Sequence, residues 1–198
     1  EGIPGIEGVD TRRITRMIRN QGSMRAIMCD VEKPDNEALK QLKNTPVPHE
    51  QVANVSCKKR WYSRAAGVRF NVVAVDCGIK LGIIRGLAER NCNVTVVPYN
   101  TSAPEILALS PDGLFLSNGP GDPEDVKPVI DLVRKLRGQL PIFGICLGHQ
   151  MIALANGCQT YKLKFGHRGG NHPVKNLATG KIEMTSQNHS YADDPDSV

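Results

Sequence analysis

Residues 141–150 read PIFGICLGHQ, in which a short apolar run leads into Cys146 with a glycine two positions away on either side. The form Gly-x-nucleophile-x-Gly is typical of a sharp turn between a strand and a helix, where strained backbone geometry needs small neighbours. Such a turn exposes the cysteine at the edge of a sheet, and the partial positive charge of the helix N-terminus favours a thiolate. The pattern alone leaves open a second interpretation, a buried cysteine that closes a strand.

The residues around this turn alternate between strand and helix patterns. Short apolar runs predict strands at residues 71–76, 93–98, 113–117 and 141–145. Apolar residues at helical spacing predict helices at about 80–90, 102–109, 124–137 and 148–156. Alternation of this kind implies an α/β fold with an open, flavodoxin-like parallel sheet and helices on both faces. This setting favours the nucleophile over the buried cysteine.

The first third of the chain follows another pattern. Asp10 is placed to cap a helix over about residues 11–20, and Gly22 follows the end of that helix. One face of this helix is apolar, with Ile14, Met17 and Ile18. A second short helix is predicted over residues 35–43.

Residues 44–68 contain prolines, basic residues and weak periodicity, which indicate a linker. We therefore expect residues 1–68 to be the C-terminal part of an N-terminal domain with its linker, and residues 69–198 to be the α/β domain. Because the sequence starts at a glutamate and stops just after DDPDS, we also expect it to be part of a longer protein.

The net charge of +5 comes from residues 1–69, which carry 13 Lys/Arg and 8 Asp/Glu, whereas residues 70–198 carry 12 of each. A solvated face or a protein interface explains this excess better than nucleic acid, because aromatic residues are only 5% and do not alternate with basic ones. No apolar run approaches the roughly 20 residues of a membrane span, and no signal peptide is visible. We expect a cytoplasmic protein that binds neither nucleic acid nor membranes.

The six cysteines contain no Cys-x-x-Cys pair, which argues against a zinc site. Without a signal peptide, reduced thiols are the better interpretation. We expect no metal ion and no cofactor in this chain.

SNGPGDP, residues 117–123, follows the third predicted strand. Gly119 and Gly121 allow backbone N–H groups to approach an oxyanion or a carboxylate closely, although a plain turn would have the same composition. No Gly-x-x-x-x-Gly-Lys-[Ser/Thr] motif occurs, which excludes a P-loop. Ligands of open parallel sheets bind beyond the carboxyl ends of the strands, so this loop and CLGHQ mark the expected site.

Four segments carry a resemblance to the class I, triad-type glutamine amidotransferases: GLFLSNGPGDP (113–123), PIFGICLGHQ (141–150), KFGHRGGNHPV (164–174) and TSQNHSYA (185–192). More narrowly, GIPGIEGVDTRRITRMIRNQG (2–22) resembles a segment of the small, glutaminase subunits of carbamoyl-phosphate synthetases.

The resemblance implies that Cys146 attacks the side-chain amide of glutamine, releases ammonia and leaves a thioester for water to hydrolyse. It implies an oxyanion hole made by the backbone N–H groups of Gly119 and Leu147. The glutamine-binding residues that it implies are Gly119, Gly121, Leu147, Gln150, Asn188, Ser190 and Tyr191. At position 190 the family often has glycine where this chain has serine.

The resemblance also implies a histidine base oriented by glutamate in a His-x-Glu motif, which these 198 residues lack. His172-Pro173 is followed by valine, so we expect His172 to be structural or pocket-lining. His149 is expected to pack or cap, and solvated or hydrogen-bonded roles are expected for His167 and His189. We expect the base and its acid to lie beyond residue 198, and this chain alone to be nearly inactive.

The implied partner is the large synthetase subunit, in a heterodimer. That subunit would use ATP, Mg²⁺, bicarbonate and the ammonia to make carbamoyl phosphate for arginine and pyrimidine synthesis. One alternative is a triad amidotransferase of anthranilate, GMP or 4-aminodeoxychorismate synthesis, against which VDTRRITR (9–16) argues. The others are a non-catalytic partner-binding domain, which Cys146 disfavours, and a cysteine peptidase, which Gln150 and the Gly119/Gly121 loop disfavour.

Overall fold

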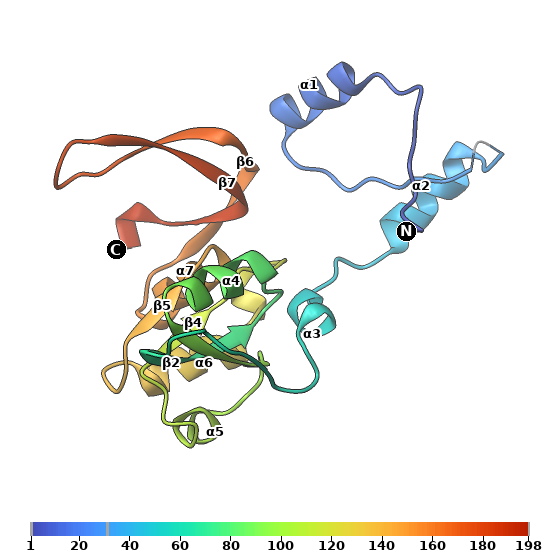
Figure 1. The fold of residues 1–198 in the computed structure, drawn as a ribbon. Coiled ribbons are helices and arrows are strands. Elements are labelled where there is room, and N and C mark those ends of the chain that lie inside the picture. Colours follow the sequence, from blue (N-terminus) through green and yellow to red (C-terminus); the bar gives the residue numbers. More distant parts are fainter. Residues whose placement is uncertain (1, 31, 198) are drawn as a thin grey trace. The chain divides into compact units, whose positions relative to one another are not determined.

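The computed structural model describes residues 2–30 and 32–197, and Figure 1 shows the order of its elements. The chain forms two compact units. The first comprises Glu1–Pro48 with Lys162–Ser190, and the second comprises His49–Tyr161 with Tyr191–Val198. Compact units need not coincide with domains, so the expected division of the chain after residue 68 stays a prediction.

A five-stranded sheet forms the centre of the second unit, with the strand order β1-β3-β2-β4-β5. Its strands are β1 (Trp61–Ser63), β2 (Phe70–Asp76), β3 (Cys92–Pro98), β4 (Gly113–Leu116) and β5 (Ile142–Gly144). All pairings are parallel except that of β1, which lies antiparallel to β3 at one edge. The last four residues of β2 are all buried, as expected for a parallel strand that is covered on both faces.

Helices cover the two faces of this sheet, which confirms the α/β fold predicted from the sequence. The helices of the unit are α3 (Gln51–Val55), α4 (Leu81–Glu89), α5 (Ala103–Leu107), α6 (Lys127–Leu136) and α7 (Leu147–Ala155), with the 3-10 turns η1 (Pro123–Asp125) and η2 (Pro195–Ser197). On one face, Ile84 of α4 packs with Ala74 and Phe115. On the other face, α6 and α7 pack over the alternate strand positions Val73, Val75, Leu114 and Leu116.

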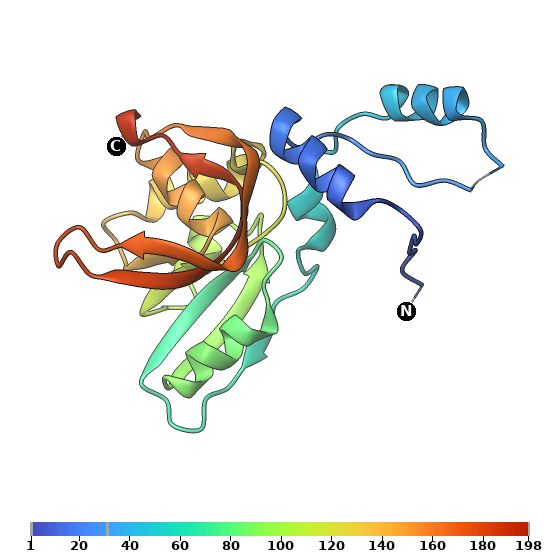
Figure 2. The same cartoon turned by 90° about the horizontal axis from the view of Figure 1, so that it is seen from above.

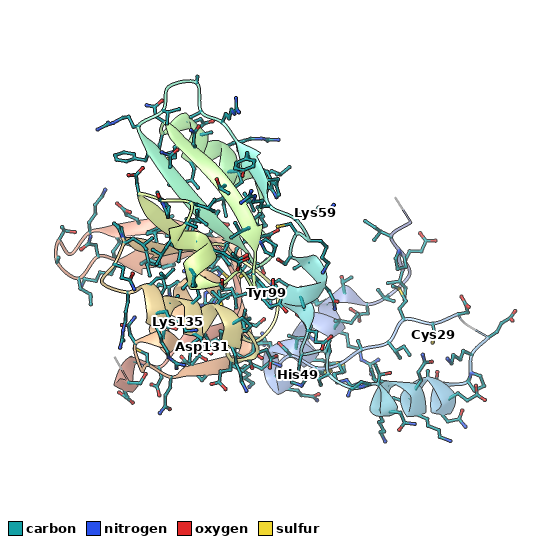
Figure 3. The ribbon with its side chains drawn as sticks, turned by 90° about the horizontal axis from the view of Figure 1, so that it is seen from below. Cys29, His49, Lys59, Tyr99, Asp131 and Lys135 are labelled. Atoms are coloured by element: carbon teal, nitrogen blue, oxygen red, sulfur yellow. The ribbon has the colours of Figure 1, made fainter. Side chains whose placement is uncertain are left out.

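Residues 44–68 are more ordered than a linker, because they contain α3 and β1. Val52 of α3 is only 5% exposed and joins the core under α6 and α7. The backbone N–H of Tyr99, labelled in Figure 3, donates to Ser56 Oγ at 3.0 Å and ties this segment to the end of β3. A helix of five residues and a strand of three are too short to show periodicity, which explains why the sequence did not predict them.

The first unit contains α1 (Thr11–Gln21), α2 (Asp35–Asn44) and most of a hairpin formed by β6 (Thr160–Lys175) and β7 (Ile182–Asp193). Figure 2 shows the two long strands side by side, in orange and red. Asp10 Oδ1 accepts the N–H of Arg13 at 2.9 Å, which confirms the predicted cap of α1. After Gly22, the N–H of Ser23 donates to the carbonyl of Lys164 at 2.7 Å, so α1 is joined to β6.

In the described part of the chain, no helix combines the length and the apolar composition needed to cross a membrane.

Candidate active site

Cys146 lies between the end of β5 and the first residue of α7, with φ 54° and ψ −110°. A positive φ is strained for any residue with a side chain, and it is the conformation expected of a nucleophile on a strand-to-helix turn. The thiol is partly exposed, whereas Leu147 beside it is buried. The turn therefore presents the sulfur beyond the carboxyl end of the parallel strands, and not in the core.

The two glycines that flank Cys146 are required by close backbone packing. A Cβ on Gly144 would lie 2.4 Å from the carbonyl carbon of Gly148. A Cβ on Gly148 would lie 2.3 Å from the carbonyl oxygen of Leu116 in β4. Neither contact is possible between real atoms, so the Gly-x-Cys-x-Gly pattern has a direct steric cause: the first turn of α7 lies against the strand ends.

Gly119 is held against the start of α7 by the same kind of packing. A Cβ on Gly119 would lie 2.2 Å from the carbonyl oxygen of Cys77 and 2.7 Å from Leu147 Cδ2. Among the described residues, neither the N–H of Gly119 nor that of Leu147 donates a hydrogen bond, and the first N–H groups of a helix have no intrahelical acceptor. Backbone N–H groups without an acceptor can bind an oxyanion where they point to the same place.

Asp76, the last residue of β2, organises the loop behind Gly119. It is 5% exposed, and its Oδ1 accepts the N–H groups of Gly78 and Ile79, each at 2.9 Å. Its Oδ2 accepts the N–H of Cys57 at 2.8 Å. Asp76 was not among the predicted site residues, although a carboxylate directly after an apolar strand is a visible signal in the sequence. The residue is structural in this arrangement, because its carboxylate accepts three backbone N–H groups and a hydrogen bond from the Cys57 side chain.

Two further cysteines lie near this end of the sheet, and their environments differ from that of Cys146. Burial, followed by the charge of Asp76, raises the pKa of the Cys77 thiol to about 12. Burial and the same carboxylate raise the pKa of Cys57 to about 11. Both thiols are therefore protonated near neutral pH and poor nucleophiles. No disulfide joins any of the six cysteines, all of which lie in the described part of the chain.

The end of β7 contacts α7 in the turn after the cysteine. Gln150, itself 7% exposed, donates from Nε2 to the carbonyl oxygen of Tyr191 at 2.6 Å. One position earlier on α7, His149 Nδ1 lies 3.0 Å from Asp193 Oδ2. His149 thus pairs with a carboxylate, and the packing or capping role expected for it stays a prediction.

Tyr191 also contacts the loop that contains Gly119 and Gly121. Burial, followed by a hydrogen bond to the Asp122 carboxylate, raises the pKa of Tyr191 to about 12, so the phenol is neutral and donates to Asp122. Asp122 Oδ1 in turn accepts the N–H of Glu124 at 3.0 Å. The second unit therefore brings together six of the predicted site residues: Cys146, Leu147, Gln150, Tyr191, Gly119 and Gly121.

Asn188 and Ser190 lie in the first unit, on β7, where both contact Arg168 of β6. The histidines of this hairpin lie close together: the ring of His167 is centred 4.9 Å from that of His189 and 5.6 Å from that of His172. Arg168 was not among the residues predicted from the sequence. The assignment of Asn188 and Ser190 to a glutamine site stays a prediction, as do the structural or hydrogen-bonded roles expected for the three histidines.

The described residues contain no group of three or more His, Cys, Asp or Glu side chains placed to hold a metal ion. The expectation that this chain binds neither a metal nor a cofactor remains a prediction.

Comparison with known proteins gives a consistent set of similarities. Residues 73–198 match the family described as glutamine amidotransferase class-I. The whole chain is 54% identical to the carbamoyl phosphate synthase small chain of Listeria monocytogenes (strain EGD-e), of which it covers 54%. Over 99% of its length it is 55% identical to that of Staphylococcus epidermidis (strain RP62A), of which it covers 53%. The chain thus spans about half the length of the curated relatives it matches.

Among solved structures, a putative GMP synthase subunit from Thermoplasma acidophilum is similar with a TM-score of 0.53 and 26% identity. The similarity covers 62% of this chain and 66% of that protein. It supports the α/β architecture independently of the carbamoyl phosphate synthase relatives.

Proposed function

This chain belongs to the class-I glutamine amidotransferase family, and on that basis we propose that it provides the glutamine-hydrolysing site of a carbamoyl-phosphate synthase small chain. The observation that carries the proposal is the position of Cys146 on a strained turn, directly before Leu147, whose N–H, like that of Gly119, donates to none of the described residues. The relatives that match the chain over its whole length carry the name carbamoyl phosphate synthase small chain. This name favours carbamoyl phosphate synthesis over the reactions served by other amidotransferases.

In the proposed reaction, the thiolate of Cys146 attacks the side-chain amide carbon of glutamine. The amide oxygen becomes an oxyanion that accepts from the N–H groups of Gly119 and Leu147. Cleavage of the C–N bond releases ammonia, which takes the thiol proton by way of a base, and leaves a glutamyl thioester. Water then hydrolyses the thioester to glutamate and restores the thiol. The positive end of α7 favours both the thiolate and the oxyanion.

The proposed base is a histidine oriented by a glutamate, and no His-x-Glu sequence occurs in these 198 residues. We therefore propose that the pair lies further along the complete protein, and that the 198 residues alone hydrolyse glutamine slowly or not at all. Ammonia release by this chain at the rate of the complete small chain would contradict that proposal.

We propose that the glutamine-binding residues are the seven that the resemblance implies. Gln150 is well suited to the amino-acid end of the substrate. Its Nε2 is committed to the carbonyl of Tyr191, which leaves Oε1 as an acceptor for an ammonium group. Burial holds this side chain in place, so the acceptor is oriented before glutamine binds.

The proposed partner is a large synthetase subunit that forms a heterodimer with the complete small chain in the cytoplasm. That subunit would bind ATP and Mg²⁺ and combine ammonia with bicarbonate to give carbamoyl phosphate for arginine and pyrimidine synthesis. The excess of basic residues in 1–69 is available for docking to it. Exchange of Arg12 and Arg16 for glutamate is expected to weaken assembly of the two chains, which analytical ultracentrifugation would measure.

Covalent labelling tests the function most directly. The complete small chain, treated with an electrophilic glutamine analogue, is expected to carry one adduct, which peptide mass spectrometry locates on Cys146. The Cys146→Ala variant is expected to carry none. A folded protein that stays unlabelled would contradict the proposal and favour a non-catalytic partner-binding role.

A further inference from the structure

A cavity of about 650 Å³ lies at the carboxyl end of β3, where Val97 and Pro98 form part of its wall. Strands β2 to β5 are parallel, so this cavity and the Cys146 turn lie at the same edge of the sheet, the edge where such sheets bind ligands. Two strands separate β3 from β5, which places their ends about 14 Å apart at the usual strand spacing of about 4.8 Å. The cavity is therefore distinct from the proposed glutamine site, and its volume is typical of small-molecule sites.

Three consecutive basic residues, Lys58, Lys59 and Arg60, line this cavity, and all three are exposed. They precede β1, whose antiparallel pairing with β3 brings this segment beside the last residues of that strand. Lys58 Nζ donates to the carbonyl of Ala53 at 2.7 Å. By contrast, the side chains of Lys59, labelled in Figure 3, and Arg60 form no ion pair or hydrogen bond with the described residues. Two cations are thus available to a ligand.

One acidic residue, Glu105 of α5, lines the same cavity. Hydrogen bonds from the side chain and the backbone N–H of Ser102 lower the pKa of Glu105, so its carboxylate is charged near neutral pH. These bonds form the cap of α5 and hold the carboxylate at the start of that helix. Three positive charges and one negative charge leave a net charge of +2 on the lining side chains. A concave surface with this excess attracts anions.

Other residues of the cavity suit the uncharged part of a ligand. The side-chain amide of Asn100 contains both donors and an acceptor, and it bonds to none of the described residues. Thr101 Oγ1 donates to the carbonyl of Pro98 at 2.8 Å, which leaves its lone pairs as acceptors. Pro98 and Leu109 add apolar surface. Hydroxyl groups match the first two residues and C–H surface matches the other two, and a sugar presents both.

We propose that this cavity binds a phosphorylated sugar, with its phosphate against Lys59 and Arg60 and its hydroxyl groups against Asn100 and Thr101. A phosphate monoester carries about 1.5 to 2 negative charges at pH 7, which matches the excess positive charge of the cavity. Arg60 can donate two parallel hydrogen bonds to phosphate oxygens, and Lys59 adds a point charge.

A sugar phosphate fits the cavity better than a nucleic acid does. Within the part of the chain that the structure describes, no aromatic side chain lines the cavity, so no ring is present to stack on a base. The site is also independent of the proposed glutaminase chemistry, because it uses none of the residues assigned to that reaction.

Isothermal titration calorimetry of the complete protein with glucose 6-phosphate tests the site. The double variant Lys59→Met, Arg60→Met is expected to weaken binding at least about tenfold, because hydrogen bonds between charged groups are lost. Its matched control is Arg85→Met, Lys135→Met, which removes the same two charges from exposed positions on α4 and α6. The control is expected to change the affinity less than about twofold, since salt screens distant surface charges. Glucose without phosphate is expected to bind at least about tenfold more weakly than its phosphate ester.

Inorganic phosphate is the second probe, and it is expected to bind more weakly than glucose 6-phosphate. Asn100→Ala is expected to lower this preference about threefold without changing the affinity for inorganic phosphate. Equal affinities of the wild type for the two compounds would overturn the assignment of a sugar phosphate. Absence of glucose 6-phosphate binding at millimolar concentration, or equal weakening by the two double variants, would overturn the site itself.

The same titration after assembly with a synthetase partner separates a ligand site from a protein interface. Binding that persists in the assembled protein is the expected result. Binding that is lost on assembly would show that the partner covers Lys59 and Arg60, and it would overturn the ligand site. The labelling of Cys146 is measured separately, so failure of this inference and failure of the proposed function give different results.

Discussion

The side-chain amide of Gln150 and the main-chain carbonyl of Tyr191 form a hydrogen bond of 2.6 Å across 41 positions of sequence. Gln150 lies one turn into α7 from Cys146, and Tyr191 lies on β7 with its hydroxyl bonded to Asp122. This bond thus closes a ring of contacts that runs from the nucleophile turn to β7 and back to the Gly119/Gly121 loop. Loss of any link is expected to loosen the positions of the others.

Replacing Gln150 with leucine is expected to lower both stability and glutamine binding. The change leaves the Tyr191 carbonyl without its donor, which costs about 1–3 kcal/mol for a buried group. It also removes the proposed acceptor for the substrate ammonium, so KM for glutamine is expected to rise about tenfold. Urea unfolding and steady-state kinetics measure the two effects.

Gln139→Leu is the matched control, since Gln139 Nε2 also donates to a backbone carbonyl, that of Lys135, but at an exposed site. It is expected to change stability by about 0.5 kcal/mol or less and to leave KM unaltered. If both variants changed stability and KM equally, the buried hydrogen bond between Gln150 and Tyr191 would have no larger effect than an exposed one.

Alanine at Gly148 is expected to prevent the native turn from forming. Its Cβ would lie 2.3 Å from the backbone oxygen of Leu116, which cannot move away as a flexible side chain could. We therefore expect the free energy of unfolding to fall by more than about 3 kcal/mol. We also expect Cys146 to lose its labelling by the glutamine analogue. Gly82→Ala provides the contrast. It lies within α4, with nothing within 4 Å of the added Cβ, so it is expected to stabilise the protein by up to about 1 kcal/mol. Thermal unfolding of both variants gives the comparison.

The sequence predicted the elements that bury apolar residues in a regular pattern. Strands β2 to β5 are apolar runs, α6 repeats its apolar residues at helical spacing, and the glycines around Cys146 reveal the turn. The β6–β7 hairpin was not predicted as a pair of strands, because most of its residues are exposed and it shows no alternation of apolar and polar residues.

The contacts that complete the site depend on the fold, which is why the sequence could not reveal them. Cys146 and its two flanking glycines are contiguous and form a readable motif. Asp76, Asp122 and Arg168 act through partners that are distant in sequence or through backbone groups, and no motif includes all members of such a contact. Of these, only Asp76 left a signal, as an acid at the end of an apolar strand.

Asp76→Ala is expected to destabilise the protein strongly. The carboxylate accepts three backbone N–H groups in a buried place, and the change leaves all three without an acceptor, so we expect a loss of about 3 kcal/mol or more. Asp76→Asn retains one acceptor oxygen and is expected to lose less. Asp131→Ala, at an exposed surface pair with Arg134, is expected to change stability by about 0.5 kcal/mol or less. Urea titrations that rank these variants differently would contradict the structural role of Asp76.

The phenol of Tyr191 predicts a stability change in alkaline solution. Burial and the Asp122 carboxylate raise its pKa in the folded protein to about 12, whereas a tyrosine in the unfolded chain titrates near pH 10. Between these values the unfolded chain loses the proton and the folded chain keeps it, so the unfolded state binds fewer protons and stability falls as pH rises. The contribution is complete below about pH 10 and disappears as pH approaches about 12. In Tyr191→Phe, the free energy of unfolding, measured with urea between pH 9 and 12, is expected to fall less with pH than in the wild type. Identical pH profiles for the two proteins would exclude the hydrogen bond to Asp122.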